Sequence, residues 1–322
     1  MPASAAPTAA TYWVELSESQ QRQYIDAESV HRALQDALRD AAEVRGSMLW
    51  REVKGTSYLV RTNLDNSQKS LGAQSKATRA VFDKFMARKA ALQERVTRLK
   101  ASAELATRLN RAQRVGRTPA VVVKLLQVLA KAGLEKHFLV VGTHALYAYE
   151  SACGVRFLDD ATATQDVDLL MNTQKHMSLV STLDRDHGSL LALLQKADKS
   201  FELRDDQLQT AVNADGFEVD VIRRYAKGDD PHPLKTSSAE RDFWAVQVGS
   251  GEQMMSSPRY AQMVVGVSGQ MATMHTIAPQ AFVRLKRKLA ASKSREAIKK
   301  SKDALQARAV AALVKELMPL HA

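Results

Sequence analysis

Residues 165–171 read Gln-Asp-Val-Asp-Leu-Leu-Met, and this short stretch decides how the rest of the chain is interpreted. It has the length and apolar character of a buried strand. Because alternate side chains of a strand point to the same side, Asp166 and Asp168 project together, with apolar residues on the other face. Two carboxylates held so close repel each other unless a cation lies between them, and hard divalent ions such as Mg²⁺ prefer oxygen ligands. The stretch therefore predicts a strand that carries part of a metal site.

Two further segments carry groups of related chemistry. Residues 216–222 (GFEVDVI) form a second expected strand, with Glu218 and Asp220 on one face. If this strand lies beside the first, Asp220 completes three carboxylates of the kind that hold two metal ions, and Glu218 is either an outer ligand or a structural acid. Upstream, an apolar run ends in Gly142-Thr143 before a helical pattern. Glycine lets the backbone approach a phosphate closely, and a hydroxyl and a helix N-terminus bind phosphate oxygens.

A D-x-D pattern alone is weak evidence, because it also occurs on surface strands and hairpins. It is a metal motif of glycosyltransferases as well, but such an enzyme would need a sugar-nucleotide-binding α/β half upstream, and residues 1–135 are mostly helical in pattern. The order found in this chain is narrower. A strand-Gly-Thr-helix unit precedes a D-x-D on an apolar strand, and another acid follows on a later apolar strand. This order favours a site that binds a metal ion together with a nucleotide.

Apolar periodicity and turn residues predict an α-rich N-terminal part, a mixed α/β core and a helical C-terminal part. Helices are expected over 17–45, 76–113, 120–132, 144–151 and 174–196, and again after Pro279. Strands are expected within 47–62 and at 137–141, 165–171, 200–203, 208–212, 216–222, 243–248, 261–266 and 270–276. Polar stretches at 63–75, 152–163 and 223–240 are expected to be loops. The turn residues Asn213-Ala214-Asp215-Gly216 predict a hairpin between the strands that flank them.

The composition restricts the class of protein. Hydrophobic residues make up 45% of the 322 residues and charged residues 25%, which is ordinary for a globular chain. A single cysteine, Cys153, allows neither an intramolecular disulfide nor a cysteine-based zinc cluster. The N-terminal residues lack the basic and apolar regions of a signal peptide, and no run approaches the roughly 18 apolar residues of a membrane span. A cytoplasmic protein without a membrane partner is expected.

Positive charge is concentrated in two segments. The formal net charge of the chain is +11, and residues 76–117 carry 12 lysines and arginines against 3 acids. Residues 281–322 carry 11 against 3, so the remainder of the chain is slightly acidic. Such segments favour polyanionic partners such as nucleic acid, although long helices also often carry a solvated basic face.

The order of these motifs resembles the DNA polymerase β-like nucleotidyltransferase superfamily. More closely, the chain is similar to a bacterial family described as nucleotidyltransferase-like, and the similarity extends over most of residues 12–312. The segments that carry it in the core are VVGTHALYAYE (140–150), ATQDVDLLM (163–171), KSFELR (199–204) and GFEVDVIR (216–223).

The resemblance implies an α+β fold with a polymerase-β-type core, a mixed sheet with helices, at residues 133–278. A flexible N-terminus (1–11), a mainly helical region (12–132) and a basic helical region (279–322) would flank it. The implied reaction moves a nucleoside monophosphate from a nucleoside triphosphate, such as ATP or GTP, to an acceptor hydroxyl or phosphate. It would use Mg²⁺ or Mn²⁺ and release pyrophosphate.

The resemblance also implies roles for particular residues. Gly142 and Thr143 would hold the triphosphate. Asp166 and Asp168 would each ligate both metal ions, and Asp220 would ligate the catalytic metal and help to activate the acceptor.

In related enzymes a lysine on the first C-terminal helix meets the phosphates. Lys286 is the best match for it, followed by Arg295, Lys299 and Lys302, and Asp303 is placed to orient one of these cations. The alternative is that all of them are solvated helix charges.

Two departures from the family pattern bear on activity. Thr143 stands where serine is commoner, and the gap between Gly142 and Asp166 is longer than usual, so that residues 152–164 would have to loop out. Both departures leave room for an inactive member of the fold that binds nucleic acid. The pattern also does not identify the acceptor of an active member. RNA such as a tRNA end, a protein side chain and a small molecule are all compatible with it.

Aromatic residues after the Gly-Thr turn have two interpretations. His144 could contact a phosphate, and Tyr147 and Tyr149 could stack on a base. Packing in the helix is the expected role of the two tyrosines. A non-functional role is also expected for His144, because histidine is common at the start of a helix.

Overall fold

The computed structural model describes residues 12–63, 67–162, 164–228 and 230–318. Within these ranges the chain separates into two units, one of residues 22–110 and the other of the residues up to 21 and from 111 onward. The flexible segment expected at 1–11 lies outside the described residues. The finer division of the chain at residues 132 and 278 stays a prediction.

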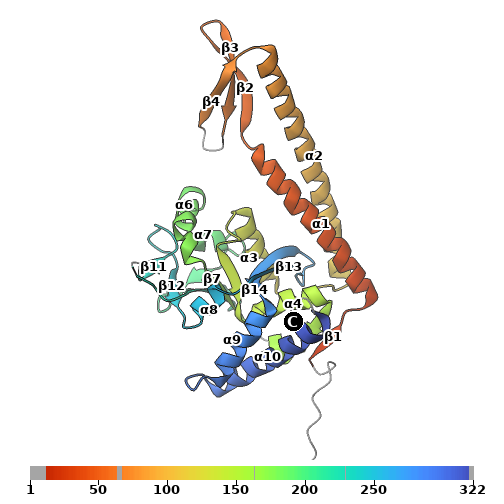
Figure 1. The fold of residues 1–322 in the computed structure, drawn as a ribbon, viewed down its shortest axis with the longest axis vertical. Coiled ribbons are helices and arrows are strands. Elements are labelled where there is room, and N and C mark those ends of the chain that lie inside the picture. Colours follow the sequence, from red (N-terminus) through yellow and green to blue (C-terminus); the bar gives the residue numbers. More distant parts are fainter. Residues whose placement is uncertain (1–11, 64–66, 163, 229, 319–322) are drawn as a thin grey trace, which may run out of the picture. The chain divides into compact units, whose positions relative to one another are not determined.

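The unit of residues 22–110 is a pair of long helices with a three-stranded antiparallel sheet between them in the chain (Figure 1). The helices are α1 (Glu18–Glu43) and α2 (Lys76–Ala112), and the strands are β2 (Ser47–Val53), β3 (Thr56–Thr62) and β4 (Gln68–Ala73). Gln23 Nε2 donates to Asn110 Oδ1 at 3.0 Å, and Arg95 Nη1 lies 3.2 Å from Asp40 Oδ2, so polar contacts join the two helices.

Strand β4 corrects the expectation of a loop over 63–75. It pairs antiparallel with β3 at the edge of the small sheet. Its residues are mostly exposed, so their polar character carries no buried alternation from which a strand could be predicted.

A mixed sheet of seven strands, counted over the described residues, forms the centre of the other unit. Strand β7 (Asp166–Met171) lies between β5 (Phe138–Val141), which is antiparallel to it, and β10 (Glu218–Arg223), which is parallel. The far edge of β10 pairs first with β9 (Thr210–Val212) and then with β12 (Trp244–Gln247). Strands β8 (Glu202–Leu203) and β11 (Leu234–Lys235) pair with β9 and β12, respectively.

This topology confirms two expectations and corrects a third. The hairpin on the turn after β9 is present, and the two acid-bearing strands are neighbours. The polar stretch 223–240 is not entirely loop, because the two residues of β11 pair with β12. A strand of two residues is too short to show a periodicity.

Burial of one face of the sheet explains where the acids point. Val167, Leu169, Val219 and Val221 are completely buried. Full burial of such a side chain contributes roughly 1.5–3 kcal/mol, so sliding either strand by one residue would be strongly unfavourable. The alternate residues of both strands, which include the acids, must therefore project from the opposite face.

Helices and a β-ribbon surround the sheet. The helices are α3 (Ala120–Lys131), α4 (Leu146–Cys153), α6 (His176–Asp186), α7 (Leu190–Leu194), α8 (Gly251–Met255), α9 (Pro279–Ala291) and α10 (Ala297–Leu317), with 3₁₀ turns η2 (Gly142–Ala145) and η3 (Thr173–Lys175). The ribbon, β13 (Arg259–Val265) and β14 (Met271–Ile277), packs on α4, β5 and α3. Helices α9 and α10 lie side by side, as Figure 1 shows. No helix in the described part of the chain is long and apolar enough to cross a membrane.

The single helix expected over 174–196 is instead η3, α6 and α7. Gly188 has φ of 80°, in the left-handed region that glycine adopts readily, and it ends the run. Ser189 then caps α7, because its hydroxyl oxygen accepts from the backbone N–H of Ala192 at 2.9 Å. The helical spacing of the apolar residues continues across this break, which explains why the sequence pattern predicts a single helix.

The segment expected to loop out between the Gly-Thr turn and the D-x-D forms regular elements in its described residues. It contains β6 (Val155–Phe157) and the short helix α5 (Asp159–Thr162). Strand β6 pairs antiparallel with β1 (Trp13–Glu15), which comes from a distant part of the chain. A three-residue strand with so remote a partner leaves little local signal in the sequence.

A buried carboxylate ties this segment to the start of α3. Glu150 is 4% exposed, and it accepts hydrogen bonds from the guanidinium of Arg117 and from the backbone N–H of Phe157 at 2.7 Å. Arg117 also donates to the carbonyl of Phe157 and to the carboxylate of Asp159. Because Glu150 is almost fully buried while Asp159 is 94% exposed, removing Glu150 should destabilise the protein far more than removing Asp159.

We predict that Glu150→Ala lowers the free energy of unfolding by about 3 kcal/mol, since it removes the buried carboxylate that pairs with Arg117 and leaves the backbone N–H of Phe157 without its acceptor. Urea denaturation measures the change. The matched control is Asp159→Ala, which removes the exposed partner of the same arginine and should leave the urea midpoint nearly unchanged. Equal losses for the two variants would contradict this assignment.

Candidate active site

Three aspartates face one another across the parallel strands β7 and β10. Asp220 lies opposite Asp168 in the register of the two strands, and Glu218 lies opposite Asp166. One carboxylate oxygen from each of the three aspartates lies within 4.8 Å of the others. The expectation that Asp166, Asp168 and Asp220 converge is therefore confirmed as geometry.

The electrostatics of this cluster fit a divalent cation. Burial, together with the negative charges of Asp166 and Asp220, raises the pKa of the Asp168 carboxyl to about 7, while Lys286 and Arg295 oppose the shift. The pKa of Asp220 is also raised, chiefly by burial. Oxygen ligands that repel one another in this way suit Mg²⁺ or Mn²⁺, whose charge would relieve the repulsion. The donor set therefore fits the metal that the sequence pattern predicts.

Hydroxyl and guanidinium groups orient the acids. The hydroxyl of Thr164 donates to Asp166 Oδ1, and Thr210 Oγ1 donates to Asp220 Oδ1 at 2.5 Å. Glu218 forms an ion pair with an arginine, because Arg204 Nη1 lies 2.9 Å from its Oε1.

Sequence reasoning missed these supporting groups. Thr210 could have been found, because the expected hairpin between β9 and β10 places it opposite Asp220. Arg204 gives no such signal, since it lies in a loop outside the hairpin.

The Gly-Thr turn lies directly against the acid cluster. Strand β5 ends at Val141, which is opposite Asp168, and Gly142 follows with φ of 67°. A Cβ atom on Gly142 would lie only 2.4 Å from Asp168 Oδ2. Glycine is therefore required twice at this position, for its backbone conformation and for the close approach of the carboxylate. The chain continues into the 3₁₀ turn η2 before α4 begins, which corrects the expected direct start of an α-helix at residue 144.

Two of the expected cations gather on a buried carboxylate. Lys286 Nζ lies 2.8 Å from Asp303 Oδ1, and both side chains are almost fully buried. Arg295 Nε donates to the other oxygen of Asp303. The expectation that Asp303 orients a cation of this group is confirmed as a contact. Both cations lie near enough to Asp168 for their charges to lower its pKa.

The other two expected lysines have different surroundings. Lys302 lies where burial lowers the pKa of its ammonium group and the charge of Asp166 raises it. Lys299 is exposed and pairs with Glu296, with Nζ 3.3 Å from Oε2. The structure therefore places Lys302 beside the acid cluster and Lys299 in a surface pair, and a phosphate-binding role for either stays a prediction.

The aromatic residues after the turn are packed inside the protein, as expected for the two tyrosines. His144 is 1% exposed, and its ring lies 5.6 Å from that of Tyr147 and 5.8 Å from that of Phe217. Burial lowers the pKa of His144 to about 4, so the imidazole is neutral at pH 7. Tyr149 is fully buried and donates its hydroxyl proton to the carbonyl of Ile277.

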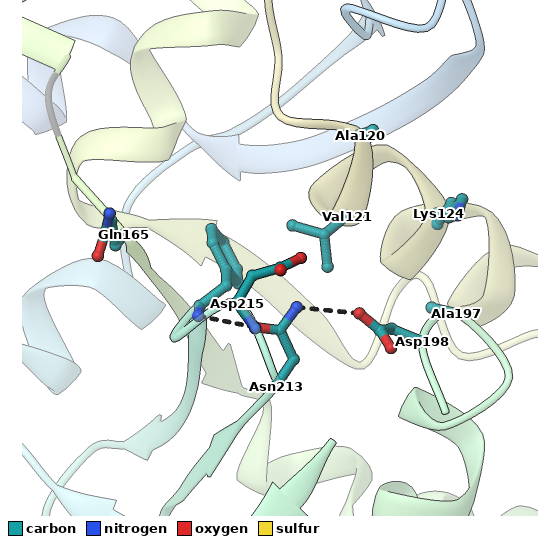
Figure 2. Close-up of a pocket in the computed structure, with 9 residues that line it drawn as sticks. Ala120, Val121, Lys124, Gln165, Ala197, Asp198, Asn213 and Asp215 are labelled. Carbon is teal, nitrogen blue, oxygen red and sulfur yellow. Dashed lines mark hydrogen bonds between the residues drawn. The ribbon is translucent and has the colours of Figure 1, made fainter. Parts of the chain in front are cut away.

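A cavity of about 420 Å³ lies beside the first residues of the two acid-bearing strands. Gln165 and Phe217 line it where β7 and β10 begin, but none of the three aspartates does. Figure 2 shows Asn213 in its wall, where Nδ2 donates to Asp198 Oδ2 at 2.9 Å. The amide of Asn213 is thus used within the wall, and the cavity is distinct from the acid cluster.

A mixed α+β fold with a cluster of three aspartates beside a glycine turn is consistent with a nucleotidyltransferase. The chain belongs to a nucleotidyltransferase family, whose sequence model matches residues 120–322. The match includes the turn after β5, all three aspartates and both C-terminal helices, and it confirms the resemblance to a nucleotidyltransferase family over that range. No curated protein and no solved structure matches the chain.

We predict that Gly142→Ala weakens the binding of Mn²⁺ at least about tenfold, because its methyl group must displace the Asp168 carboxylate. Isothermal titration calorimetry measures the affinity. Gly188→Ala is the matched control, since Gly188 also has positive φ but has no atom within 4 Å of the added Cβ. Both variants should lose stability through backbone strain, and only Gly142→Ala should lose metal affinity. Equal metal affinity in the two variants would show that the turn does not support the cluster.

We predict that Asp168→Asn raises the melting temperature of the metal-free protein at pH 8 by roughly 2–5 °C. The folded-state pKa of Asp168 lies above its ordinary value of 3.8, so the ionised carboxylate destabilises the folded protein above about pH 7. This destabilisation decreases as the pH falls from 7 toward 4, where both states become protonated. Thermal melts in EDTA at pH 8, 6 and 4.5 should therefore show a shrinking difference. A difference independent of pH would contradict the electrostatic cause.

Proposed function

We propose that this protein is a metal-dependent nucleotidyltransferase that moves a nucleoside monophosphate from a nucleoside triphosphate to an acceptor hydroxyl or phosphate. The observation that carries the proposal is the convergence of Asp166, Asp168 and Asp220 beside the glycine turn, within the stretch that matches the family. The fold would be the polymerase-β type, which the order of turn and strands supports. ATP and GTP are candidate donors.

The three aspartates would hold two Mg²⁺ or Mn²⁺ ions, which stabilise negative charge on the attacking and leaving oxygens when bound. Gly142 and Thr143 would bind the triphosphate through the backbone and the hydroxyl. Lys286 and Lys302 would neutralise its phosphates from the side of α9 and α10. Lys299, in its exposed pair with Glu296, is the weakest candidate for this role.

In the proposed reaction, an acceptor oxygen forms a bond to the α-phosphorus as the bond from that phosphorus to the bridging oxygen breaks. Pyrophosphate leaves, and Asp220 helps to remove the proton of an acceptor hydroxyl. Thr210 would orient Asp220 for this step through its 2.5 Å hydrogen bond. The protein's part is then mainly positioning and charge neutralisation.

An RNA acceptor is the candidate that the charge distribution favours. The unit of residues 22–110 carries 17 lysines and arginines against 10 acids, and the last 42 residues carry 11 against 3. Basic surfaces of this kind attract phosphate backbones without reading sequence. A protein side chain or a small molecule remains an alternative acceptor.

The same charge also supports a second candidate, a nucleic-acid-binding protein that keeps the fold without catalysis. Such a protein would bind RNA with a steep dependence on salt concentration and would not bind nucleotide with Mg²⁺. Calorimetry with Mg²⁺ and each of the four nucleoside triphosphates separates the two candidates.

We predict that the wild-type protein, with Mg²⁺ and cell extract, transfers label from at least one α-³²P nucleoside triphosphate to a macromolecule or small molecule. Label at the γ position should leave with pyrophosphate. Asp166→Ala and Asp168→Ala should each reduce transfer at least about a hundredfold, because each removes a metal ligand. Asp159→Ala, which removes an exposed acid of the preceding segment, is the matched control. Transfer that persists in both ligand variants would rule out the proposed site.

A further inference from the structure

Gln306 connects the C-terminal helix to the Gly-Thr turn. It lies within α10 and is completely buried. Its Nε2 atom lies 3.1 Å from Thr143 Oγ1 and 2.7 Å from the carbonyl oxygen of Ala161. One side-chain amide therefore joins α10, η2 and α5, which are far apart in the sequence.

The carbonyl of Ala161 determines which way the amide of Gln306 faces. A carbonyl oxygen can only accept a hydrogen bond, so the group that faces it must be the NH₂ of the amide. The same NH₂ group faces Thr143 Oγ1, and its two protons serve the two contacts. The hydroxyl oxygen of Thr143 is therefore an acceptor in this contact.

This contact restricts what the hydroxyl of Thr143 can do next. With one lone pair engaged by Gln306, the proton of the hydroxyl must point toward a different acceptor. Thr143 is partly exposed and follows Gly142, which lies against the carboxylate of Asp168. A phosphate oxygen bound at the acid cluster is an acceptor of the right kind in the right place, because it can only accept hydrogen bonds.

The geometry points to Gln306 as a positioning residue that makes the hydroxyl of Thr143 a donor to the phosphates of the nucleotide, which rests on the proposed function. Gln306 touches no substrate in this scheme and acts only through Thr143. Gln306 sets the direction of the Thr143 hydroxyl before the nucleotide binds. The side chain of Thr143 therefore needs less ordering on binding.

The carbonyl oxygen of the Gln306 side chain indicates that packing alone does not explain this residue. Gln306 Oε1 is buried and has no hydrogen-bond partner among the described residues. An unpaired buried acceptor is unfavourable, and leucine or methionine would fill the same volume without one. The benefit of an amide at this position therefore lies in the two contacts of its NH₂ group.

A double-mutant cycle tests the inference, with calorimetry as the measurement. The wild-type protein is first titrated, with Mg²⁺ present, with the α,β-methylene analogues of ATP, GTP, CTP and UTP, and the analogue that binds most tightly is then used for every variant. Thr143→Val should weaken binding about tenfold, as the loss of one charge-assisted hydrogen bond. Gln306→Met should weaken it about threefold to tenfold. If Gln306 acts through the hydroxyl, the double variant should bind no worse than Thr143→Val alone.

Controls separate positioning from structural damage. In a Thr143→Ser background the hydroxyl is kept, so Gln306→Met should still weaken binding there. Gln306→Leu repeats the cycle should Gln306→Met fail to fold, and melts without ligand report folding for every variant. Additive losses in the double variant would overturn the positioning role, because a structural effect of Gln306 would not require the hydroxyl. A wild-type protein that binds none of the four analogues would instead overturn the proposed function, and this inference with it.

Discussion

The parallel pairing of β7 and β10 places Asp168 opposite Asp220, and the repulsion between these carboxylates is the constraint on which the rest of the site depends. The buried apolar faces of the two strands hold the register, so the acids cannot move apart without exposing that face. Burial is the chief cause of the raised pKa values of both carboxyls, and the negative charges of neighbouring acids add to the shift. The folded protein thus maintains an arrangement that is unfavourable in the absence of a cation, as metal and catalytic sites often are.

The neighbouring elements make sense in relation to this cluster. Glycine stands at position 142 because a side chain there would meet the Asp168 carboxylate. Hydroxyls of Thr164 and Thr210 orient Asp166 and Asp220. Lys286 of α9, which pairs with Asp303 of α10, brings positive charge near enough to lower the pKa of Asp168. The family match covers these elements together, which supports interpreting them as one site.

The sequence was sufficient for the parts of the site that depend on local pattern. The alternation in residues 166–171 and 218–223 predicts both strands and the common face of their acids, and the hairpin turn places β9 beside β10. What could not be predicted depends on distant contacts. The pairing of β6 with β1 joins strands of three residues, and Gln306 reaches Thr143 from 163 positions away. Neither leaves a periodic signal, because one partner alone carries no information about the other.

The exposed strand β4 and the break at Gly188 show two further ways in which local pattern misleads. Strand β4 has polar residues because its side chains face solvent. The break at Gly188 lies within an apolar pattern that continues across it. In both cases the backbone pairing or capping determined the element, whereas the side-chain pattern did not.

The most direct test of the three-aspartate site is anomalous diffraction from crystals grown with Mn²⁺ and a non-hydrolysable nucleotide analogue. We expect manganese peaks between the carboxylates of Asp166, Asp168 and Asp220, with the triphosphate against the turn at Gly142. Manganese bound elsewhere, or an acid cluster that stays empty while nucleotide is present, would contradict the central claim that these three residues form a metal site for nucleotidyl transfer.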